Sequence, residues 1–504
     1  MTHIDIKSPQ PGAAAAAFLG KGEHKLLIDG EWVTCASKAT FDTLDPATGA
    51  VIGRLQRAGE ADVDAAVAAA RKAFESGPWP AMTPLARSQL LWNIADVLEA
   101  NIDELAELET LDQGKALYVG RWAEIPGAIA QFRYFAGMAT KIEGSTIPTS
   151  INYQPEGKQV FAYTRRQPVG VVGAIVPWNS PLVLTAMKIA PALAAGCTMV
   201  LKPAEDTSLT AVRLLELMQE AGLPKGVVNL ITGLGMEAGA ALAAHKDVNK
   251  VAFTGSTQTG RAILQASAGN LKRVSLELGG KSPVIIMPDA DLDAAIPGAA
   301  NAIFFNGGQV CIAGSRLYAH ASVYDRVVEG IAAAAQSITL GHGLDPATHM
   351  GPLVSQKHAA KVASFIEHSR AAGASIVTGG EAIGPNASFI TPTVVANAKP
   401  DAAIMREEVF GPVLVVTPFD DTEEVIAAAN DSDYGLAAGI WTEGLSNATR
   451  LAERINAGTV WINSHAMYDA SLPIGGMKQS GYGRDSGQAA LENYLELKTV
   501  CAIV

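Results

Sequence analysis

A cysteine and a glutamate combine the residue types and the surroundings that covalent chemistry on a carbonyl group requires. Cys311 ends a glycine-bearing run, 306–310, and Glu277 lies between Leu276 and Leu278. A thiolate attacks a carbonyl carbon readily, and a carboxyl group in apolar surroundings can reach the raised pKa that a general base needs. The pair therefore predicts a covalent intermediate on sulfur. Each side chain also has a simpler interpretation: a small buried hydrophobe for Cys311, and a core carboxylate capped by the following glycine amides for Glu277.

Three further motifs stand at the ends of predicted strands. The segment 253–260 leads from a strand into a helix, where glycine and free N–H groups suit a phosphate, and Gly235 belongs to a weaker version of the same turn. Lys202 and Glu205 have the spacing to hold the hydroxyls of an adenine ribose, and the acid would repel a 2′-phosphate, which favours NAD over NADP. Asn179 is placed to donate to a developing oxyanion. Taken singly, each motif is more simply an ordinary turn or a solvated ion pair.

These motifs belong to a region in which short apolar runs alternate with alanine- and leucine-rich helical stretches. Strands are predicted at 169–176, 198–201, 227–231, 250–253 and 274–276, with helices at 182–195, 207–221, 235–244 and 260–268 between them. Such alternation predicts a parallel sheet with crossover helices. A sheet of this kind binds ligands beyond the carboxyl ends of its strands, where the motifs lie.

A second α/β region is predicted between residues 283 and 463. Its strands are expected at 284–287, 316–319, 375–378, 413–419, 439–442 and 459–463. Upstream, the helical spacing of apolar residues predicts amphipathic helices at 60–76 and 90–105. The segment 494–504 has the composition of a strand, and we expect it to pair with another strand because nothing after it covers it.

The composition excludes several classes of protein. The chain has 504 residues, enough for about three domains, and 48 % hydrophobic against 17 % charged residues permits a large core and argues against wholesale disorder. Lysine and arginine number 38 against 50 acidic residues, so the net charge of −12 argues against nucleic acid as the main partner. A local anionic ligand stays compatible with this charge, because backbone amides at helix N-termini bind phosphate.

Cysteine usage and the amino-terminal segment indicate the compartment. The four cysteines lie far apart, without a C-x-x-C motif or a disulfide-like pattern, which indicates a reducing environment, and no metal site is predicted. The first residues lack the basic front end and apolar core of a signal peptide, and no stretch of 18 uncharged apolar residues predicts a membrane span. We therefore expect a cytoplasmic protein with a loose leader at 1–19.

Taken together, the motifs resemble those of the NAD(P)-dependent aldehyde dehydrogenase superfamily over residues 25–504. Seven runs match in the order of the family, with Glu277 and Cys311 separated by 34 positions, and the combination is far more specific than any single run. The matching runs are Val176-Pro177-Trp178-Asn179, Leu201-Lys202-Pro203-Ala204-Glu205, Phe253-Thr254-Gly255-Ser256-Thr257, Leu276-Glu277-Leu278-Gly279-Gly280-Lys281-Ser282-Pro283, Gly308-Gln309-Val310-Cys311, Glu407-Glu408-Val409-Phe410-Gly411-Pro412 and Pro473-Ile474-Gly475-Gly476-Met477-Lys478-Gln479-Ser480-Gly481.

The resemblance implies a catalytic role for three residues. Cys311 would be the nucleophile that forms a thiohemiacetal and then a thioester, and Glu277 would activate the water that hydrolyses the thioester. The Asn179 side chain and the Cys311 backbone N–H would form the oxyanion hole, where losing one donor typically costs about 10²–10³ in rate.

The resemblance also implies a set of cofactor contacts, with NAD as the expected cofactor and NADP as the less favoured one. Lys202 and Glu205 would hold the adenosine ribose, and Ser256 the pyrophosphate. Glu408 would hold the nicotinamide ribose, and Phe410 would lie beside the nicotinamide. The other implied contacts are Ile175, Pro177, Trp178, Gly235, Phe253, Gly255 and Leu278.

A substrate tunnel with an almost wholly apolar lining follows from the same comparison. It contains no arginine to hold a carboxylate or phosphate, Met187 stands where several relatives carry tryptophan, and Ser180 and Ala466 are small. We expect a medium or bulky apolar aldehyde, aromatic or terpenoid-like, and a broad substrate range, because apolar linings discriminate weakly. The implied lining residues are Val183, Leu184, Met187, Phe305, Val310, Ile312, Met467, Tyr468 and Ile474.

The implied fold is α/β and has three parts. A Rossmann-type NAD-binding domain would comprise 20–144 and 167–279, an α/β catalytic domain 280–485, and a β oligomerisation arm 145–166 and 486–504. In the arm a hairpin would pair with the terminal strand and extend a partner's sheet. The insert 151–159 departs from the shorter common form of this hairpin, and homodimers and homotetramers are both usual in the family.

The leading hypothesis is oxidation of an aldehyde with NAD and release of the free acid. A coenzyme-A-acylating semialdehyde dehydrogenase is the nearest alternative, and Glu277, which that branch lacks, argues against it. The second alternative is a catalytically silent structural relative. The intact Cys311, Glu277 and Asn179 argue against this alternative. Thiol-dependent esterase activity would be a side reaction of the same site.

Overall fold

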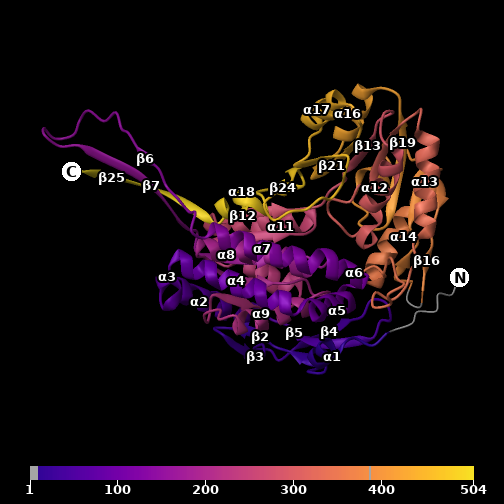
Figure 1. Ribbon diagram of the computed structural model, residues 1–504. Coiled ribbons are helices and arrows are strands. Elements are labelled where there is room, and N and C mark those ends of the chain that lie inside the picture. The colour runs from indigo at the N-terminus through magenta and orange to yellow at the C-terminus, as the bar shows by residue number, and fades with distance from the viewer. Residues whose placement is uncertain (1–8, 385–386) are drawn as a thin grey trace.

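A computed structural model describes residues 9–384 and 387–504 of the chain. In this part of the chain two large sheets form two lobes that face each other, and a narrow arm projects from the first lobe (Figure 1). The α/β class predicted from the alternating pattern is confirmed, and the two lobes match the two predicted α/β regions.

The first lobe is built on an eight-stranded sheet whose five central strands are parallel. Its outer strands are antiparallel to their neighbours. The predicted strands are confirmed with ends shifted by at most two residues. In spatial order the strands are β24 (Gly481–Tyr482), β12 (Arg273–Glu277), β11 (Lys250–Thr254), β8 (Val171–Ile175), β9 (Thr198–Lys202), β10 (Val228–Leu230), β2 (Leu26–Ile28) and β3 (Glu31–Val33).

Helices cover both faces of this sheet. Because alternate strand residues point to opposite faces, the adjacent Val171 and Val172 join different cores. Burial on both faces explains why the strand segments read as nearly continuous apolar runs. One face carries α4 (Pro84–Ala100), α7 (Ile125–Met138), α8 (Pro181–Ala195) and α9 (Leu209–Glu220), and the other carries α2 (Glu60–Glu75), η2 (Gly235–Gly239), α10 (Ala240–Ala244) and α11 (Thr257–Ala266).

The second lobe holds a seven-stranded sheet that is parallel except at one edge strand. In spatial order its strands are β15 (Ser375–Thr378), β18 (Thr393–Ala396), β19 (Val413–Phe419), β14 (Arg316–His320), β13 (Pro283–Ile286), β21 (Ala437–Trp441) and β22 (Thr459–Ile462). Helices α12 (Leu292–Phe304) and α13 (Tyr324–Ser337) pack on one face, and α14 (Gln356–Ala371), α16 (Thr422–Asn430) and α17 (Leu445–Arg454) pack on the other.

The predicted loose leader is wrong for residues 13–19, while residues 1–8 lie outside the described residues. Residues 13–19 form α1 (Ala13–Leu19), and Ala15 and Phe18, three positions apart on one helix face, are buried. Downstream, a small sheet of β1 (Glu23–His24), β5 (Val51–Gln56) and β4 (Thr40–Leu44) continues the contact with the first lobe.

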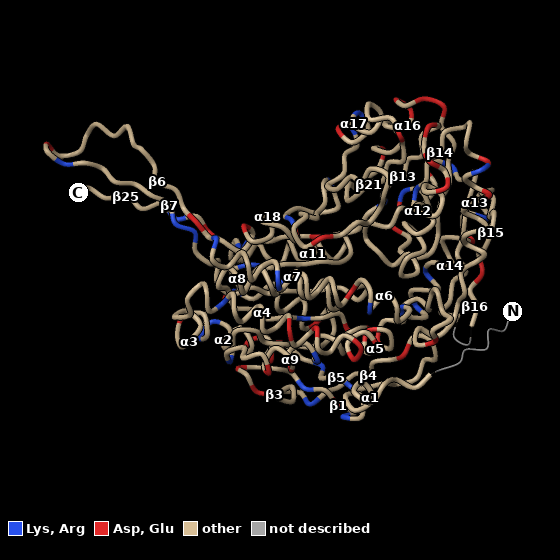
Figure 2. Tube along the Cα trace, viewed as in Figure 1, with Lys and Arg blue, Asp and Glu red and all other residues tan. Residues whose placement is uncertain are grey.

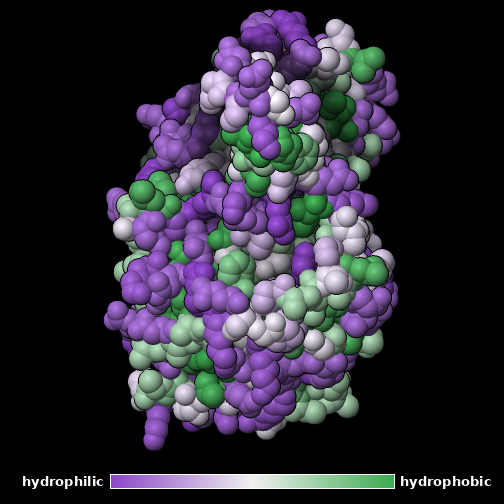
Figure 3. All heavy atoms as spheres, turned by 90° about the vertical axis from the view of Figure 1, so that its left-hand side faces the viewer, coloured by the Kyte–Doolittle hydropathy of each residue, from purple (hydrophilic) through white to green (hydrophobic). Residues whose placement is uncertain are grey.

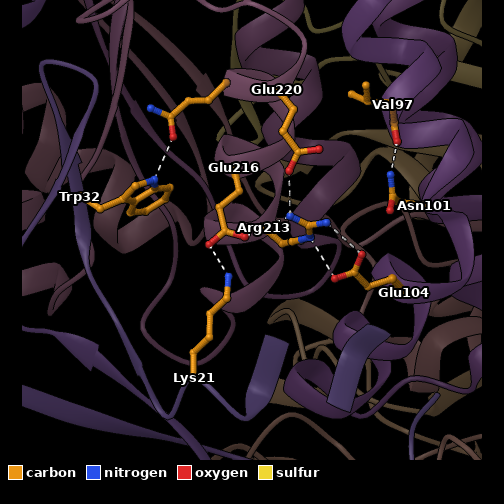
Figure 4. Close-up of polar contacts among 9 residues, drawn as sticks. Lys21, Trp32, Val97, Asn101, Glu104, Arg213, Glu216 and Glu220 are labelled. Carbon is orange, nitrogen blue, oxygen red and sulfur yellow. Dashed lines mark hydrogen bonds and ion pairs between the residues drawn. The ribbon is translucent and has the colours of Figure 1, made fainter. Parts of the chain in front are cut away.

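Ion pairs fasten this amino-terminal segment to α9. Lys21 Nζ donates to Glu216 Oε1 at 2.7 Å, and Arg213 on the same helix bonds to Glu216 at 3.1 Å (Figure 4). Arg213 also donates to Glu104 at 2.9 Å, so the guanidinium joins α9 to α5 (Ile102–Gln113).

The single helix predicted at 90–105 is wrong, because the chain breaks at Asn101. There the backbone leaves helical geometry (φ −121°, ψ 24°), and the Asn101 side-chain amide donates to the Val97 carbonyl at 2.7 Å. Asparagine competes for backbone partners in this way at helix ends. The apolar pattern continued through the break because α4 and α5 both bury their apolar faces in the same core.

The arm is a three-stranded antiparallel sheet that projects away from the body. It comprises β6 (Thr146–Ile147), β7 (Val160–Pro168) and β25 (Leu495–Ile503), and β25 pairs with β7 along its whole length. The terminal strand that we predicted is thereby confirmed, and its partner is a segment of the same chain. Apolar side chains on the arm are exposed, among them Phe161, Leu497 and Ile503. The face that bears the arm shows apolar groups among hydrophilic ones (Figure 3).

Two segments fall outside the parts to which the domain prediction assigns them. Strand β24, at 481–482, pairs with β12 in the first sheet although 280–485 was assigned to the catalytic domain. Helix α18 (Gly487–Glu492) packs against α8 rather than in the arm. Both segments are short connections, and their composition carries no signal for the sheet or helix that they join.

The surface carries charges of both signs. Lysine and arginine are interspersed with acidic residues over both lobes (Figure 2). Among residues 9–384 and 387–504, no helix is both long and apolar enough to cross a lipid bilayer.

Candidate active site

The predicted site residues of the first lobe lie at the carboxyl end of its sheet. The chain runs from β8 outward to β9 and β10, then returns to place β11 on the other side of β8. Such a reversal opens a crevice at the strand ends, where ligands bind. Asn179 follows β8, Lys202 ends β9, Ser256 follows β11 and Glu277 ends β12. The topology therefore gathers residues that are up to about one hundred positions apart in the sequence.

The Cys311 loop crosses to this edge from the second lobe. After α12 the backbone turns left-handed at Asn306 (φ 50°), Gly307 (φ 62°) and Gly308 (φ 69°). Asn306 Nδ2 donates to the Asn179 carbonyl at 3.0 Å, and Asn179 Nδ2 donates to the Gln309 carbonyl at 2.9 Å. One N–H of the Asn179 amide thus donates to the Cys311 loop, and the other N–H has no protein partner within the described residues.

Gly308 is required by a close approach as well as by its backbone angle. A Cβ at this position would lie 2.1 Å from the Gly411 carbonyl oxygen. The same tight contact holds the Cys311 loop against the segment that carries Phe410.

We expect Gly308→Ala to displace the Cys311 loop, with a cost of about 1–3 kcal/mol from overpacking and further strain from the positive φ. Catalytic rate should fall at least about tenfold, and the half-life at elevated temperature should shorten. Steady-state kinetics and residual activity after heating measure these effects. Gly269→Ala is the control, because a Cβ there meets nothing within 4 Å. Equal behaviour of the two variants would contradict the packing argument.

The Cys311 thiol is protonated in its resting surroundings. Burial, with the nearby Glu408 and Glu277 carboxyls, raises the pKa of the Cys311 thiol to about 12. A Cβ at Gly280 would lie 2.5 Å from the Cys311 carbonyl oxygen, so the glycine lets the loop approach the end of β12. Attack by sulfur therefore requires a group that removes the thiol proton.

Glu277 has the surroundings of a general base. Burial raises the pKa of Glu277 well above its usual value, and Asp485 raises it further, while Lys188 and Arg484 oppose the shift. The Gly476 N–H donates to the carboxyl, and Glu277 Oε1 has no hydrogen-bond partner among the described residues. One carboxyl oxygen is thus available to a water molecule or a thiol.

A buried ion pair that the sequence analysis missed stands beside this base. Lys188 Nζ and Asp485 Oδ2 are 2.6 Å apart, with almost no exposed side-chain surface. The two residues are 297 positions apart, on α8 and just after β24. No spacing in the sequence could have joined them.

The residues assigned to the adenosine end of the crevice lie together. Lys202 Nζ is 3.1 Å from Glu205 Oε2, and the Gly235 N–H donates to Glu205 Oε1 at 3.4 Å. A Cβ at Gly239 would lie 3.7 Å from the Lys202 side chain, so the glycines leave a shallow cradle there. The ammonium and the carboxylate thus lie side by side, where both suit the hydroxyls of a ribose.

The residues assigned to the pyrophosphate surround the start of α11. Ser256 Oγ accepts from the Thr259 N–H at 3.2 Å and caps this helix. Gly255 packs on the Phe253 ring, and a Cβ at Gly260 would lie 2.6 Å from Leu278. Free N–H groups at the helix start suit an anionic group. Ile175 is the register partner of Phe253, and Pro177 follows β8 at the same edge of the sheet.

An aromatic cluster marks the nicotinamide end. The Trp178 and Phe410 rings are 5.2 Å apart, and His358 of α14 lies 5.1 Å from Trp178. His358 Nε2 lies 2.7 Å from the Phe410 carbonyl oxygen, at a residue whose φ is +60°. Burial lowers the pKa of His358 to about 4, so the ring is neutral and donates to this carbonyl. His358 was missed because a lone histidine on a helix carries no signal.

Glu408 sits beside the Cys311 loop with one oxygen bonded. Its Oε1 accepts from the Gly280 N–H at 2.9 Å, and burial raises the pKa of Glu408 to about 7. A Cβ at Gly279 would lie 2.5 Å from Glu408 Oε2. The carboxylate is therefore held at the end of β12, next to both catalytic candidates.

The residues predicted to line the tunnel come from three places. The first two turns of α8 carry Val183, Leu184 and Met187. The Cys311 loop and the residue before it carry Phe305, Val310 and Ile312, and the segment after β22 carries Met467, Tyr468 and Ile474. His465 Nε2 lies 2.7 Å from the Ile312 carbonyl oxygen and ties the last two groups together.

Helix α7 contributes to this wall and was missed. A Cβ at Gly127 would lie 3.2 Å from Val183 and 3.5 Å from Tyr468. The Tyr468 hydroxyl hydrogen-bonds to Gln131 of the same helix, which gives the otherwise apolar wall one polar contact. Met467 is 62 % exposed and lies at the outer end of the set.

No metal centre is apparent in this region. Among the residues that the structure describes, no group of three or more His, Cys, Asp or Glu side chains is placed to hold a metal ion.

Fold and site together describe a two-lobed α/β protein with a candidate cysteine nucleophile beside the carboxyl edge of its first sheet. The family model described as "Aldehyde dehydrogenase family" matches residues 32–500. The chain belongs to the aldehyde dehydrogenase family.

Named relatives and solved structures support the same membership. Phenylacetaldehyde dehydrogenase of Pseudomonas fluorescens is 50 % identical over 479 residues, covering 95 % of this chain and 95 % of that protein. The mitochondrial benzaldehyde dehydrogenase of Antirrhinum majus is 46 % identical over 498 residues, covering 97 % and 92 %. The NAD+ complex of an aldehyde dehydrogenase from Bacillus cereus superposes with a TM-score of 0.95 at 48 % identity, covering 99 % of this chain and 100 % of that one.

Proposed function

We propose that this protein, an oxidoreductase of the aldehyde dehydrogenase family, uses NAD to oxidise a bulky apolar or aromatic aldehyde to the free acid through a thioester on Cys311. The observation that carries the proposal is the meeting of Cys311, Glu277 and Asn179 at the carboxyl edge of the first sheet. Glu277 favours release of the acid by water over transfer to coenzyme A. The three intact residues argue against a silent relative, and esterase activity would be a side reaction.

The proposed reaction begins with sulfur. Cys311 attacks the aldehyde carbon, and because the pKa of its thiol is about 12, the proton must pass to a base as the carbon–sulfur bond forms. Glu408 and Glu277 are both within electrostatic range of the thiol, and Glu277, with an unbonded oxygen, is the base that we assign. The free N–H of Asn179 and the backbone N–H of Cys311 donate to the oxyanion.

The residues of the crevice fit NAD. The Lys202–Glu205 pair suits the adenosine ribose, the α11 N-terminus a pyrophosphate, and Glu408 a second ribose. When bound, NAD supplies the hydride acceptor that turns the tetrahedral adduct into a thioester. After Glu277 has passed the thiol proton to solvent, it takes a proton from the water that attacks the thioester; the carbon–sulfur bond breaks, the acid leaves, and the Cys311 sulfur regains a proton.

Support for the choice of NAD over NADP comes from two adjacent acids. Glu205 stands beside the ribose position, and Asp206 follows it. We expect Glu205→Gln to raise kcat/KM with NADP about five- to tenfold relative to NAD, because it removes a repulsion of the order of 1 kcal/mol. Initial rates with both cofactors measure the ratio. An unchanged ratio would show that other residues set the preference.

Support for an aromatic or bulky substrate comes from the apolar set around the site and from the two relatives named for phenylacetaldehyde and benzaldehyde. The test is NADH formation, without coenzyme A, from a panel of aromatic, terpenoid and short linear aldehydes. Turnover of phenylacetaldehyde to phenylacetic acid is the expected result. A strict requirement for coenzyme A, or no turnover of any apolar aldehyde, would refute the proposal.

We further propose a cytoplasmic homodimer or homotetramer built through the arm. Support comes from the free edges of the arm sheet, a means by which chains pair, and from the exposed Phe161, Leu497 and Ile503. The domains would follow the predicted division at 20–144 with 167–279, 280–485, and 145–166 with 486–504, apart from the two segments that pack elsewhere. Sedimentation equilibrium of the protein and of a Leu497→Lys variant tests the assembly.

A further inference from the structure

Residues 177–180, which we call the Asn179 corner, connect β8 to helix α8. Serine is a favourable N-cap residue, but the Ser180 side chain does not cap this helix. Ser180 occupies the N-cap position (φ −138°, ψ 67°), and its side chain makes no capping bond. A serine cap typically stabilises a helix by about 1 kcal/mol. The Ser180 hydroxyl donates instead to Glu124 Oε1 at 2.8 Å, in the π-helical turn η1 (Gly120–Glu124). The hydroxyl thus ties the corner to another element rather than to its own helix.

Glu124 belongs to a buried cluster of three charges. Lys115 Nζ lies 2.5 Å from Glu109 Oε1 and 3.4 Å from Glu124 Oε1, and the three side chains are 0 %, 0 % and 7 % exposed. The second oxygen of each carboxyl has no hydrogen-bond partner among the described residues. Burying charged groups with incomplete partners can cost more than their attraction returns, so a buried ion pair is weak evidence of a stabilising role.

The cluster contacts both the Asn179 corner and the second lobe. Besides the Ser180 bond, the Leu182 N–H lies near the Glu109 carboxyl and opposes the rise in its pKa that burial causes. On its other side, a Cβ at Gly343 of the second lobe would lie 2.2 Å from the Lys115 carbonyl oxygen. Cys311 belongs to that lobe, and Asn179 belongs to the first. The cluster therefore stands at the seam across which the amide and the thiol must be aligned.

We propose that Glu109, Lys115 and Glu124 are positioning residues that, through the Ser180 hydroxyl, aim the Asn179 amide at the oxygen that becomes charged on the Cys311 adduct. The proposal rests on the proposed function. The Asn179 corner is held on one side by the nucleophile loop and on the other by the cluster, so its amide cannot rotate with the loop when an aldehyde enters. A donor fixed in advance stabilises the charge without reorganisation during the reaction.

The first test is Ser180→Ala, which removes the tie and keeps the cluster. We expect kcat to fall about tenfold, a part of the 10²–10³ that complete loss of an oxyanion donor costs, with unchanged KM for NAD. Alkylation of Cys311 by iodoacetamide should keep its rate, because the thiol is untouched. Ser337→Ala, which removes an exposed hydroxyl on α13, is the matched control and should leave kcat unchanged. Wild-type kcat in Ser180→Ala would overturn the proposal.

The second test asks whether the groups act through one another. Glu124→Gln keeps an acceptor for Ser180 and should retain most of the activity, whereas Glu124→Leu should match Ser180→Ala. The double variant Ser180→Ala with Glu124→Leu should be no slower than either single variant. Additive losses would overturn the proposal even if Lys115→Met proved too unstable to purify. A wild-type protein that oxidised no aldehyde would refute the proposed function. A wild-type protein that is active, but whose kcat is unchanged by Ser180→Ala, would refute only the positioning role.

Discussion

Replacement of Cys311 by alanine should reduce aldehyde oxidation below detection, a loss of about 10⁴-fold or more. An aldehyde carbon gives up hydride only after a nucleophile has made it tetrahedral, and the structure presents one thiol at the crevice. NADH formation at saturating aldehyde measures the loss. Intact-protein mass spectrometry of the wild-type protein quenched during turnover should show an acyl adduct on Cys311.

The other cysteines supply the controls. Cys197 is fully buried, burial raises the pKa of its thiol to about 11, and it donates to the Tyr494 carbonyl. Cys501 lies exposed on the arm. Cys501→Ala should keep wild-type rates, and Cys197→Ala should lose stability before activity. Substantial turnover by Cys311→Ala, or an adduct on another cysteine, would contradict the thioester route.

Replacement of Glu277 by glutamine should separate the two halves of the reaction. Steady-state turnover should fall by about 10²–10⁴-fold, the usual contribution of a general base. If thiol activation survives through water, a burst of NADH close to one equivalent per site should precede the slow phase, and the acyl enzyme should accumulate. Rapid mixing with absorbance detection, followed by mass spectrometry, measures both. Glu443→Gln, at an exposed position, is the control.

The pH dependence of this step has a definite sign. A base acts when deprotonated, and burial, with Asp485 second, raises the pKa of Glu277. Deacylation should therefore be slow below that raised pKa and should accelerate as pH rises through it. The rising limb should disappear in Glu277→Gln. An acid limb that survives the substitution would assign it to another group, such as Glu408, whose pKa burial raises to about 7.

The sequence predicted those features whose signal is local. The strands of the first sheet were found because burial on both faces makes each one a continuous apolar run, and their ends lie within two residues of the predicted ones. Motif order sufficed to place Cys311 and Glu277 in one site, although no spacing rule brings them together. The break at Asn101 was not predicted from the sequence, because α4 and α5 bury their apolar residues in the same core and the apolar pattern continues through the break.

The features that escaped prediction depend on contacts between distant segments. Lys115 and Glu124 lie within one stretch of chain, but nothing in the sequence indicates that Glu124 accepts a hydrogen bond from Ser180. His358 meets Trp178 only because α14 of one lobe reaches the crevice of the other. Helix α1 was missed because a run of alanines has little amphipathic pattern, and Phe18 alone marks its buried side.

Strand β24 has a mechanical consequence. The chain leaves the second lobe and hydrogen-bonds to β12 at Leu276 and Glu277 before it continues to the arm. This pairing joins the two lobes beside Glu277, the proposed base, and a hinged opening of the lobes would break it. Cofactor exchange must then proceed by local rearrangement of loops and side chains, and crosslinking the lobes far from the crevice should leave the rate of NADH release unaltered.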